Sequence, residues 1–320
     1  MKRGIRKAPR SRPPRRSVID CSRIRRRLQT LCARLSADPY DNTEAFLRQA
    51  AFAARSLPRG LRQALDVFAD RGNREGYLLL RGFPVAENPG TEACLALIAS
   101  RLGDLVGYLQ EKEGALFHDV SPERSQEREQ SASGSKVPLA LHTERCFHPY
   151  LPSHVMLLCL RPDPGQRART EIASVRNMMP LLPAKHLPVL FEPAFRTGID
   201  YSFGNTATEK GNGPVLSVLY GGRDDPGLRY DLDLMVGLTA QAREALEAVK
   251  RAANRACTSI RLVAGDLLII DNRRAAHGRS AFNPRYDGRD RLLKRAYLVS
   301  DLQKIKSDRR PGERVIRTRF

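Results

Sequence analysis

Two stretches of the chain carry residues that together can bind a transition metal. In LALHTERCFH, His142 and Glu144 lie two residues apart in an apolar run that predicts a β-strand. Side chains at i and i+2 share one face of a strand, so an imidazole and a carboxylate would point the same way. His277 follows the strand-like run DLLIID and can supply a third ligand. Two histidines and one carboxylate form a ligand set that suits Fe(II) and leaves its other coordination positions open.

The residues after His277 strengthen this interpretation, because a bare H-x-E also occurs on exposed edge strands. Arg291 lies fourteen residues beyond His277, at the start of a predicted strand, RLLKRAYLVS. Arg291, Arg295 and Tyr297 share one face of that strand. Two buried arginines need anionic partners, since an unpaired buried charge is very costly, and bound carboxylates suit the bidentate guanidinium group. The alternative is an exposed edge strand with solvated Arg and Lys side chains.

Over about residues 75–320 the chain resembles the clavaminate synthase-like group of Fe(II)/2-oxoglutarate-dependent oxygenases, within the taurine dioxygenase superfamily. This group includes amino-acid β-hydroxylases such as arginine and asparagine oxygenases. Its motifs occur here in family order and with near-family spacing. The stretches that carry the resemblance are GYLLLRGFPV, QEKEGALFHDV, LALHTE, PSHVMLLCLRPD, TEIASVR, GDLLIIDNRRAAHGRSAFNPRYDGRDR and KRAYLVSD.

The resemblance implies a role for each site residue. Glutamate is the group's own carboxylate ligand, so the iron ligands would be His142, Glu144 and His277. Arg291 matches the arginine that binds the distal carboxylate of 2-oxoglutarate, and Thr170 matches a threonine that helps to hold it. The expected cofactor is Fe(II), with 2-oxoglutarate and O2 as co-substrates and no catalytic residue beyond the iron site.

The substrate predicted from the resemblance is a free amino acid. Arg295 matches the position that pairs with the substrate α-carboxylate, beside Glu144 and Tyr297. If the segment GLRYDLDLM is extended, Asp231 and Asp233 point the same way and can bind a guanidinium or ammonium group. Relatives that act on free arginine use acidic residues in this segment. The alternatives are that the DLD sequence caps a helix or faces solvent, and that Tyr297 packs in the wall.

L-Arginine, or a close analogue, hydroxylated at or near Cβ is therefore the first candidate, in antibiotic or other secondary metabolism. The alternatives within the family are a clavaminate-type oxygenase of a β-lactam precursor and a lysine or asparagine hydroxylase. Hydroxylation is the expected outcome, and desaturation or ring closure stays open.

The formal net charge of +20 is concentrated at the N-terminus. Residues 1–34 carry thirteen Lys and Arg against one acidic residue, Asp20, and so account for +12 of it. This Pro- and Arg-rich composition predicts a disordered extension. Such a segment can bind phosphate groups non-specifically, which makes a nucleic-acid-associated protein the alternative from another class. No helix-turn-helix, zinc-finger or aromatic-rich RNA-binding motif accompanies it, so nucleic acid is not the expected partner.

Helical patterns precede the strand-like part of the chain. Helices are predicted at 41–57, 59–72 and 91–108, with a later amphipathic helix at 239–256. The resemblance implies a mainly β fold with flanking helices, a double-stranded β-helix (jelly-roll) barrel with the site in its mouth. The expected organisation is a disordered extension at 1–34 and an oxygenase domain at 35–320, with a helical part at about 40–105, a jelly-roll core at about 105–300 and a tail at 301–320.

Composition also bears on the compartment. The chain has no run of eighteen apolar residues, so no membrane span is expected. No apolar stretch of the kind found in secretory signals follows the basic N-terminus. The six cysteines form no C-x-x-C pair or zinc-like spacing, which predicts reduced thiols in a cytoplasmic protein. Cys146, two residues beyond Glu144, is expected to pack rather than to bind.

Overall fold

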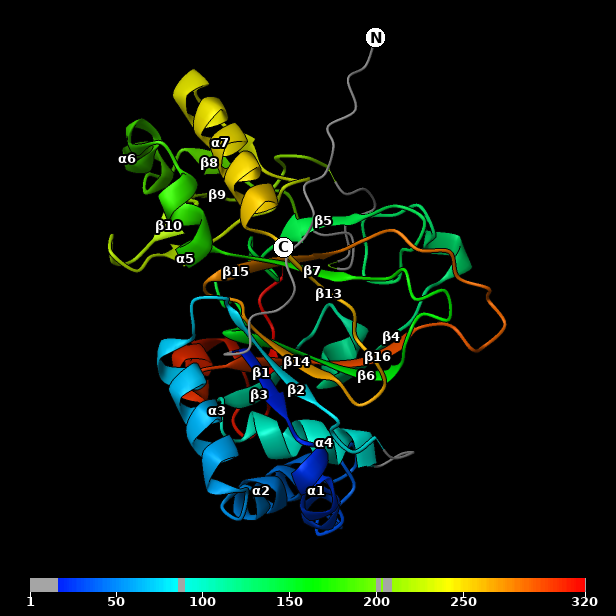
Figure 1. Cartoon of the computed structure of the whole chain (residues 1–320). Helices are drawn as coiled ribbons and strands as arrows, with labels where there is room; N and C mark the ends of the chain where they lie inside the picture. The colour runs from blue at the N-terminus through cyan, green and yellow to red at the C-terminus, as the bar shows by residue number, and fades with distance from the viewer. Residues whose placement is uncertain (1–16, 86–89, 200–202, 204–208, 320) are drawn as a thin grey trace.

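Two β-sheets face each other, with helices outside both of them, in the computed structural model (Figure 1). The structure describes residues 17–85, 90–199, 203 and 209–319. The larger sheet has the order β1 (Val18–Asp20), β2 (Tyr77–Arg81), β14 (Leu267–Asp271), β6 (His154–Arg161), β16 (Leu292–Val299), β3 (Asp104–Tyr108) and β17 (Val315–Ile316), and β4 (Phe117–Val120) also pairs with β16. The smaller sheet has the order β13 (Thr258–Ile260), β7 (Thr170–Ser174), β15 (Ala275–Arg279) and β5 (Leu139–His142).

Along the chain, eight of these strands switch from one sheet to the other at each step, except that β7 and β13 follow one another in the smaller sheet. β4, β6, β14 and β16 belong to the larger sheet, and β5, β7, β13 and β15 belong to the smaller one. Within each set the paired strands are antiparallel. Apolar side chains from both sheets form one buried cluster, which includes Leu268 and Ile270 of β14 and Ile172 of β7. Burying each such side chain contributes about 1.5–3 kcal/mol, so this cluster holds the two sheets together.

The outer faces of the sheets are covered by different helices (Figure 1). Against the larger sheet pack α1 (Arg25–Cys32), α2 (Thr43–Ala54), α3 (Arg59–Arg71) and α4 (Gly90–Ala99). Beside the smaller sheet lie α5 (Val175–Met178), α6 (Leu187–Leu190) and α7 (Ala240–Ala256). Successive side chains of β2 point to opposite faces of the sheet, so Leu78 and Leu80 face the helices while Leu79 faces the other sheet.

The predicted helices at 41–57, 59–72 and 239–256 are confirmed as α2, α3 and α7. Thr239 caps α7, because its side-chain oxygen accepts a hydrogen bond from the backbone N–H of Ala242. The predicted helix at 91–108 is too long. α4 ends at Ala99, and the chain continues after Gly103, whose φ is 155°, as β3 of the larger sheet.

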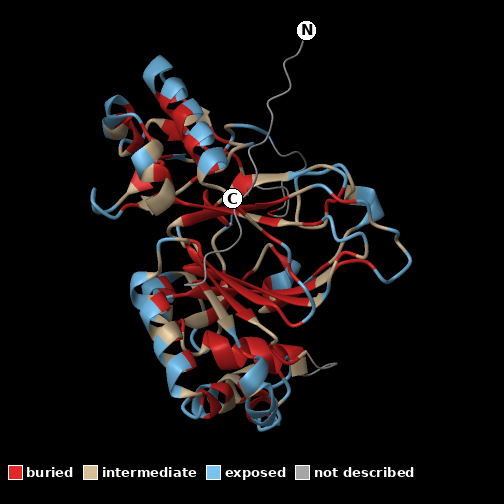
Figure 2. Cartoon of the chain, in the orientation of Figure 1, coloured by how far each residue is buried: buried red, intermediate tan, exposed pale blue. Residues whose placement is uncertain are grey.

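The prediction of a disordered extension over residues 1–34 is wrong for residues 17–34, and residues 1–16 lie outside the described part. β1 pairs in parallel with β2, and α1 follows it. Leu28 and Leu31 of α1 are buried in the cluster beneath the larger sheet. Figure 2 shows the strands of the two facing sheets mostly buried and the surrounding helices exposed on their outer sides. The arginine-rich composition predicted disorder, but the arginines lie on the outer side of the helix. The leucines at i and i+3 share its other face and pack in the core.

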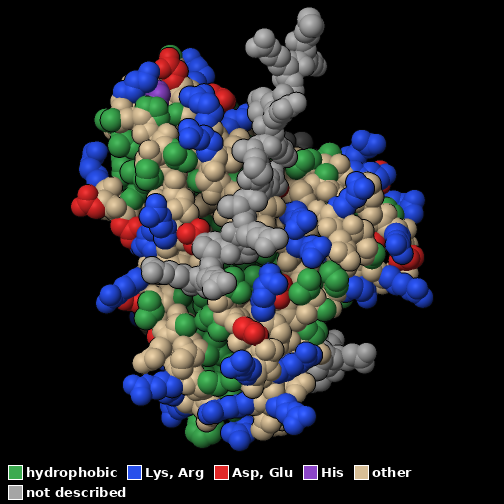
Figure 3. All heavy atoms as spheres, in the orientation of Figure 1, with side chains coloured by type: hydrophobic (Ala, Val, Ile, Leu, Met, Phe, Trp, Pro, Cys, Tyr) green, Lys and Arg blue, Asp and Glu red, His purple; other side chains and the backbone are tan. Residues whose placement is uncertain are grey.

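Two small sets of short strands lie in the region between β7 and α7 of the chain. One three-stranded sheet has the order β12 (Val236–Gly237), β8 (Phe195–Arg196) and β9 (Val215–Leu216), and a second pair consists of β10 (Leu219–Tyr220) and β11 (Gly227–Leu228). Within the described ranges, none of the helices has the length and apolar character needed to cross a membrane. Lys and Arg side chains are spread over the whole face shown in Figure 3.

Candidate metal and substrate site

One cavity of about 310 Å³ collects most of the residues singled out in the sequence. Its lining includes His142, Glu144, Thr170, His277, Arg291 and Arg295. Paired strands bring the two histidines together, since His277 of β15 lies opposite His142 of β5 and their ring centroids are 4.5 Å apart. One potential ligand atom from each of His142, Glu144 and His277 lies within 4.8 Å of the other two.

Glu144 reaches this group by a route that differs from the predicted one. β5 ends at His142, so Glu144 does not share a strand face with it but begins a turn, in which Arg145 has φ 56°. The Glu144 carboxylate nevertheless faces the histidines, with Oε2 3.5 Å from Nε2 of His277. On its other side, the Tyr297 hydroxyl donates to Glu144 Oε1 at 3.2 Å. The turn therefore replaces the strand as the support of the carboxylate.

The states of the three groups fit a divalent cation with nitrogen and oxygen ligands. Nδ1 of His142 donates to the backbone carbonyl of Ala140 at 2.9 Å, which leaves Nε2 with a lone pair for a metal. Burial lowers the pKa of His277, so its imidazole is neutral at pH 7. Burial alone would raise the pKa of Glu144, but the hydrogen bond with His277 and the nearby arginines hold it well below its ordinary value. Imidazole nitrogens and a carboxylate are ligands that suit Fe(II).

The cavity also offers a buried cation to an anionic ligand. Arg291, immediately before β16, is 8% exposed, and burial lowers its pKa. Within the ranges that the structure describes, Arg291 has no carboxylate at ion-pair distance. Thr170, the first residue of β7, is buried and lines the same cavity. Because a buried cation without a partner is unfavourable, this end of the cavity is suited to a carboxylate supplied by a ligand.

Sequence reasoning missed Arg279, which holds the loop at this end. Arg279 is buried, and burial lowers its pKa to about 9. Its guanidinium group donates to the backbone carbonyls of Ser131, Ala132 and Val137 at 3.1–3.3 Å. It lies two residues after His277, so the i, i+2 rule for a strand face could have identified it. The loop at 131–137 is therefore fixed to the strand that carries a histidine of the site.

Arg295 lies in the cavity as predicted, but it already has an anionic neighbour. Glu111 forms ion pairs with both Arg295 and Arg145, and all three side chains are buried. Burial alone would raise the pKa of Glu111, but the two arginines outweigh it and lower the pKa to about 2. Glu111 and Arg145 were both missed in the sequence. A signal for Glu111 was nevertheless present. Buried arginines need an anionic partner, and Glu111 is an acidic residue of the family-like stretch QEKEGALFHDV.

This cluster predicts a specific pH dependence of stability. Because the folded state depresses the pKa of Glu111 from 4.5 to about 2, its contribution is complete above pH 4.5 and is lost as the pH falls towards 2. The full shift corresponds to about 3 kcal/mol, and more than half of it is lost by pH 3. Urea unfolding of the wild type and Glu111→Gln should therefore give free energies of unfolding that converge between pH 6 and pH 3. Parallel curves would contradict the assignment.

The predicted side-chain partners Asp231 and Asp233 do not line the cavity. The extended geometry assumed for them is wrong, because Leu232, Asp233 and Leu234 form a turn. The Asp231 carboxylate accepts hydrogen bonds from the backbone N–H groups of Asp233 and Leu234, both at 2.9 Å, and Asp233 is exposed. Aspartate favours this turn because its side chain bonds the backbone two or three residues on. The backbone of Asp231 still lies beside His142, which it pairs in an isolated β-bridge.

Two other predicted neighbours of the site take supporting places. Tyr297 is buried and does not line the cavity, and its hydroxyl lies between the carboxylates of Glu111 and Glu144. Cys146 is buried, and its Sγ is 3.2 Å from Oγ1 of Thr197. Tyr297 therefore acts on the site through Glu144.

Comparison with known proteins gives a consistent result. A model of the family described as taurine catabolism dioxygenase TauD, TfdA family, matches residues 53–297. Clavaminate synthase 2 of Streptomyces clavuligerus is 36% identical over 301 residues, which cover 89% of this chain and 92% of that protein. The crystal structure of an asparagine oxygenase in complex with Fe(II), 2S,3S-3-hydroxyasparagine and succinate has a TM-score of 0.86 and 33% identity, covering 94% of this chain and 99% of that one.

A second solved structure is that of the non-heme iron oxygenase OrfP in complex with Fe, succinate and (3S)-hydroxy-L-Arg. It has a TM-score of 0.81 and 29% identity, and the match covers 93% of this chain and 99% of that one. The family match spans more than half of the chain, and clavaminate synthase 2 matches nearly end to end. The chain belongs to the TauD/TfdA family of dioxygenases.

Proposed function

We propose that the protein catalyses the Fe(II)- and 2-oxoglutarate-dependent hydroxylation of a free amino acid at or near Cβ. The observation that carries this proposal is the presence, in one cavity, of the His142, Glu144 and His277 group and the buried cation of Arg291. The similar asparagine oxygenase and OrfP are complexed with iron, succinate and a hydroxylated amino acid. Succinate is what 2-oxoglutarate becomes when it loses CO2 and gains oxygen, which supports the same co-substrate here.

The residues divide the work as follows. Iron bound by His142, Glu144 and His277 would supply the power to oxidise an unactivated C–H bond. Arg291 and Thr170 hold the distal carboxylate of 2-oxoglutarate and so fix its orientation. Arg295, on the same strand face as Arg291, holds the α-carboxylate of the amino acid. Glu111 keeps the Arg295 guanidinium in place, and Tyr297 holds the metal-binding carboxylate by its hydrogen bond.

The architecture that carries this site is proposed to be a double-stranded β-helix, or jelly roll. Its support is the division of eight antiparallel strands between two facing sheets, four in each, with the chain switching sheets at every step except from β7 to β13. The oxygenase unit, with its helical part, core and tail, is proposed on the same basis, and it includes residues 17–34 because β1 and α1 pack in the larger sheet and its cluster. The part of the chain that the structure describes contains no disulfide, which fits a reducing compartment such as the cytoplasm.

L-Arginine remains the first candidate substrate, and asparagine is the second. The case for arginine rests on the similarity to OrfP. The backbone of Asp231 lies beside His142, but the side chains of Asp231 and Asp233 do not line the cavity. The observation that favours a neutral side chain is that Glu111, a buried carboxylate of the cavity, is already paired with two arginines. Lysine and a β-lactam precursor follow from the same family.

A panel of amino acids incubated with protein, Fe(II), 2-oxoglutarate and O2 tests the proposal. We expect one member to gain the mass of one oxygen atom while succinate forms in equal amount, as detected by mass spectrometry. Succinate release without modification of any amino acid would refute the free-amino-acid assignment.

The same assay separates the alternative from another class. A variant lacking residues 1–16 should keep full turnover if the chain is an amino-acid oxygenase. A nucleic-acid-associated protein would instead lose its binding to DNA or RNA while showing no turnover in either form.

A further inference from the structure

Glu144 has no strand to hold its backbone, although it is one of the three residues proposed to bind iron. β5 supports His142, and β15 supports His277 by a register that pairs the two residues directly. Thr143 is held by Tyr230, whose backbone carbonyl accepts the Thr143 N–H at 2.7 Å. Glu144 follows as the first residue of a turn. A carboxylate on a turn keeps a fixed position only if another group holds its peptide.

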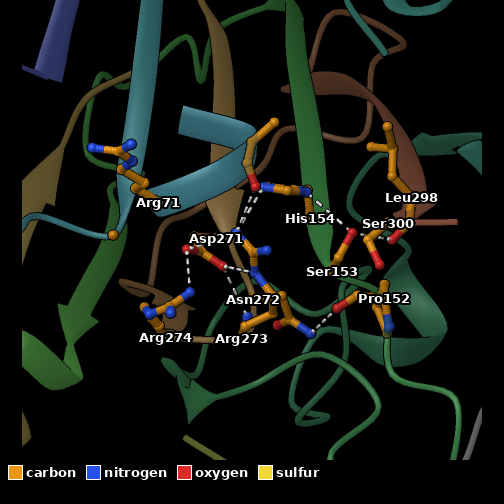
Figure 4. Close-up of polar contacts among 12 residues, drawn as sticks. Arg71, Pro152, Ser153, His154, Asp271, Asn272, Arg273, Arg274, Leu298 and Ser300 are labelled. Carbon is orange, nitrogen blue, oxygen red and sulfur yellow. Dashed lines mark hydrogen bonds and ion pairs between the residues drawn. The ribbon is translucent and has the colours of Figure 1, made fainter. Parts of the chain in front are cut away.

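The side chain of Asn272 supplies that support. Its Oδ1 accepts the backbone N–H of Glu144 at 2.6 Å, and its Nδ2 donates to the backbone carbonyl of Glu144 at 3.0 Å. This exchange of one donor and one acceptor is what a neighbouring antiparallel strand would provide. The second hydrogen of Nδ2 is donated to the carbonyl of Pro152 at 2.9 Å (Figure 4). Asn272 is completely buried, and both hydrogens and the oxygen of its side-chain amide are hydrogen-bonded to backbone groups.

The turn that presents Asn272 is itself fixed. The Asn272 N–H donates to the carbonyl of Ser153, immediately before β6, at 3.0 Å. Asp271, completely buried, is paired with Arg273 at 2.7 Å and with Arg274 at 3.5 Å, as Figure 4 shows. β15 begins at the end of this turn and carries His277 five residues beyond Asn272. Asn272 therefore ties the Glu144 peptide to the turn from which β15, with a histidine of the site, begins.

We propose that Asn272 is a positioning residue of the metal site, which sets the place of the Glu144 carboxylate relative to the two histidines. This inference rests on the proposed function, because it takes Glu144 as an iron ligand. Asparagine is required for a chemical reason. Aspartate has the same size but no N–H to donate to the carbonyls of Glu144 and Pro152, and alanine has neither group.

Loss of this support acts on one ligand of three. The histidines keep their strand pairing in Asn272 variants, and Glu144 keeps its hydrogen bond from Tyr297. Outer partners of metal ligands typically contribute 10- to 100-fold to metal affinity, so we expect Asn272→Ala to weaken metal binding on the order of 10- to 100-fold. Asn272→Asp keeps the acceptor for the Glu144 N–H and should show a smaller loss. The displaced carboxylate should also increase succinate formation without hydroxylation of the amino acid.

The test is titration of the metal-free protein with Co(II), a spectroscopic substitute for Fe(II), followed by its visible absorption bands. The matched control is Asn73→Ala, because Asn73 also clasps two backbone groups, the carbonyl of Tyr77 and the N–H of Gly76, each at 2.8 Å. Both alanine variants should lower the unfolding temperature. Only the Asn272 variants should weaken Co(II) binding, alter its absorption bands and raise the ratio of succinate to hydroxylated amino acid.

The outcomes separate the two proposals. If wild-type protein binds Co(II) and Asn272→Asp and Asn272→Ala bind it with unchanged affinity and spectrum, the positioning role is overturned while the metal site stands. If the wild-type protein itself does not bind Co(II), the proposed function fails. If Asn272→Ala does not fold, Asn272→Ser takes its place in the titration. Its Co(II) affinity and that of Asn272→Asp are then compared with those of the wild type and Asn73→Ala.

Discussion

Replacing His142 with alanine should abolish both hydroxylation of the amino acid and formation of succinate. Removal of one of three ligands leaves a site that cannot hold the metal, so the loss should exceed the roughly 100-fold typical of an outer partner. The fold should survive, because His142 is only partly buried and its strand pairing with His277 uses the backbone. Turnover, bound iron and the unfolding temperature of the purified variant give the three readouts.

A buried histidine away from the cavity provides the control for this variant. His186 is 5% exposed and lies in the helical segment before α6, so His186→Ala should lose stability and keep turnover. Full activity in His142→Ala would contradict the iron assignment. Loss of activity in both variants together with their unfolding would show a general effect of removing a buried imidazole.

Replacing Arg291 with glutamine should raise KM for 2-oxoglutarate on the order of 100-fold or more, because truncating one partner of a buried charge pair costs about 2–5 kcal/mol. The free energy of unfolding without co-substrate should stay the same or increase, since the guanidinium is buried without a described carboxylate beside it. Weaker binding of 2-oxoglutarate without a loss of free energy of unfolding distinguishes an arginine that binds a ligand from one that stabilises the fold.

Two comparisons sharpen this experiment. Arg291→Lys keeps the charge without the bidentate geometry and should fall between the wild type and Arg291→Gln. Arg161→Gln removes an exposed arginine of β6, whose Nε donates to the backbone carbonyl of Asp290, and should leave KM for 2-oxoglutarate unchanged. An unchanged KM in Arg291→Gln would refute the co-substrate assignment.

The local patterns that predicted helices and strand faces are ones in which burial repeats with the period of the element. β16 shows this most clearly. Its predicted face with Arg291, Arg295 and Tyr297 points to the cavity and its surroundings, while Lys294 points the other way, where it pairs with Glu92 of α4 at 2.9 Å and with Asp119. Alternation along a single strand is a local property, so the sequence contains it.

The features that could not be predicted depend on pairs far apart in the chain. Asn272 and Glu144 are separated by 128 residues, and Glu111 and Arg295 by 184. The i, i+2 spacing of His142 and Glu144 did not reveal that the strand ends at His142. Beyond His142 the backbone of Glu144 is bonded to the side chain of Asn272 and not to a neighbouring strand. The extended geometry expected for Asp231 and Asp233 failed for a related reason, since the Asp231 side chain bonds its own backbone in a turn.

The most direct test of the central claim is an iron-edge anomalous diffraction map of crystals loaded with Fe(II). We expect a single peak per chain, within bonding distance of Nε2 of His142, a carboxylate oxygen of Glu144 and Nε2 of His277, with 2-oxoglutarate density reaching Arg291 when it is added. A fully loaded crystal with its iron peak elsewhere, or with no peak between these three residues, would contradict the account.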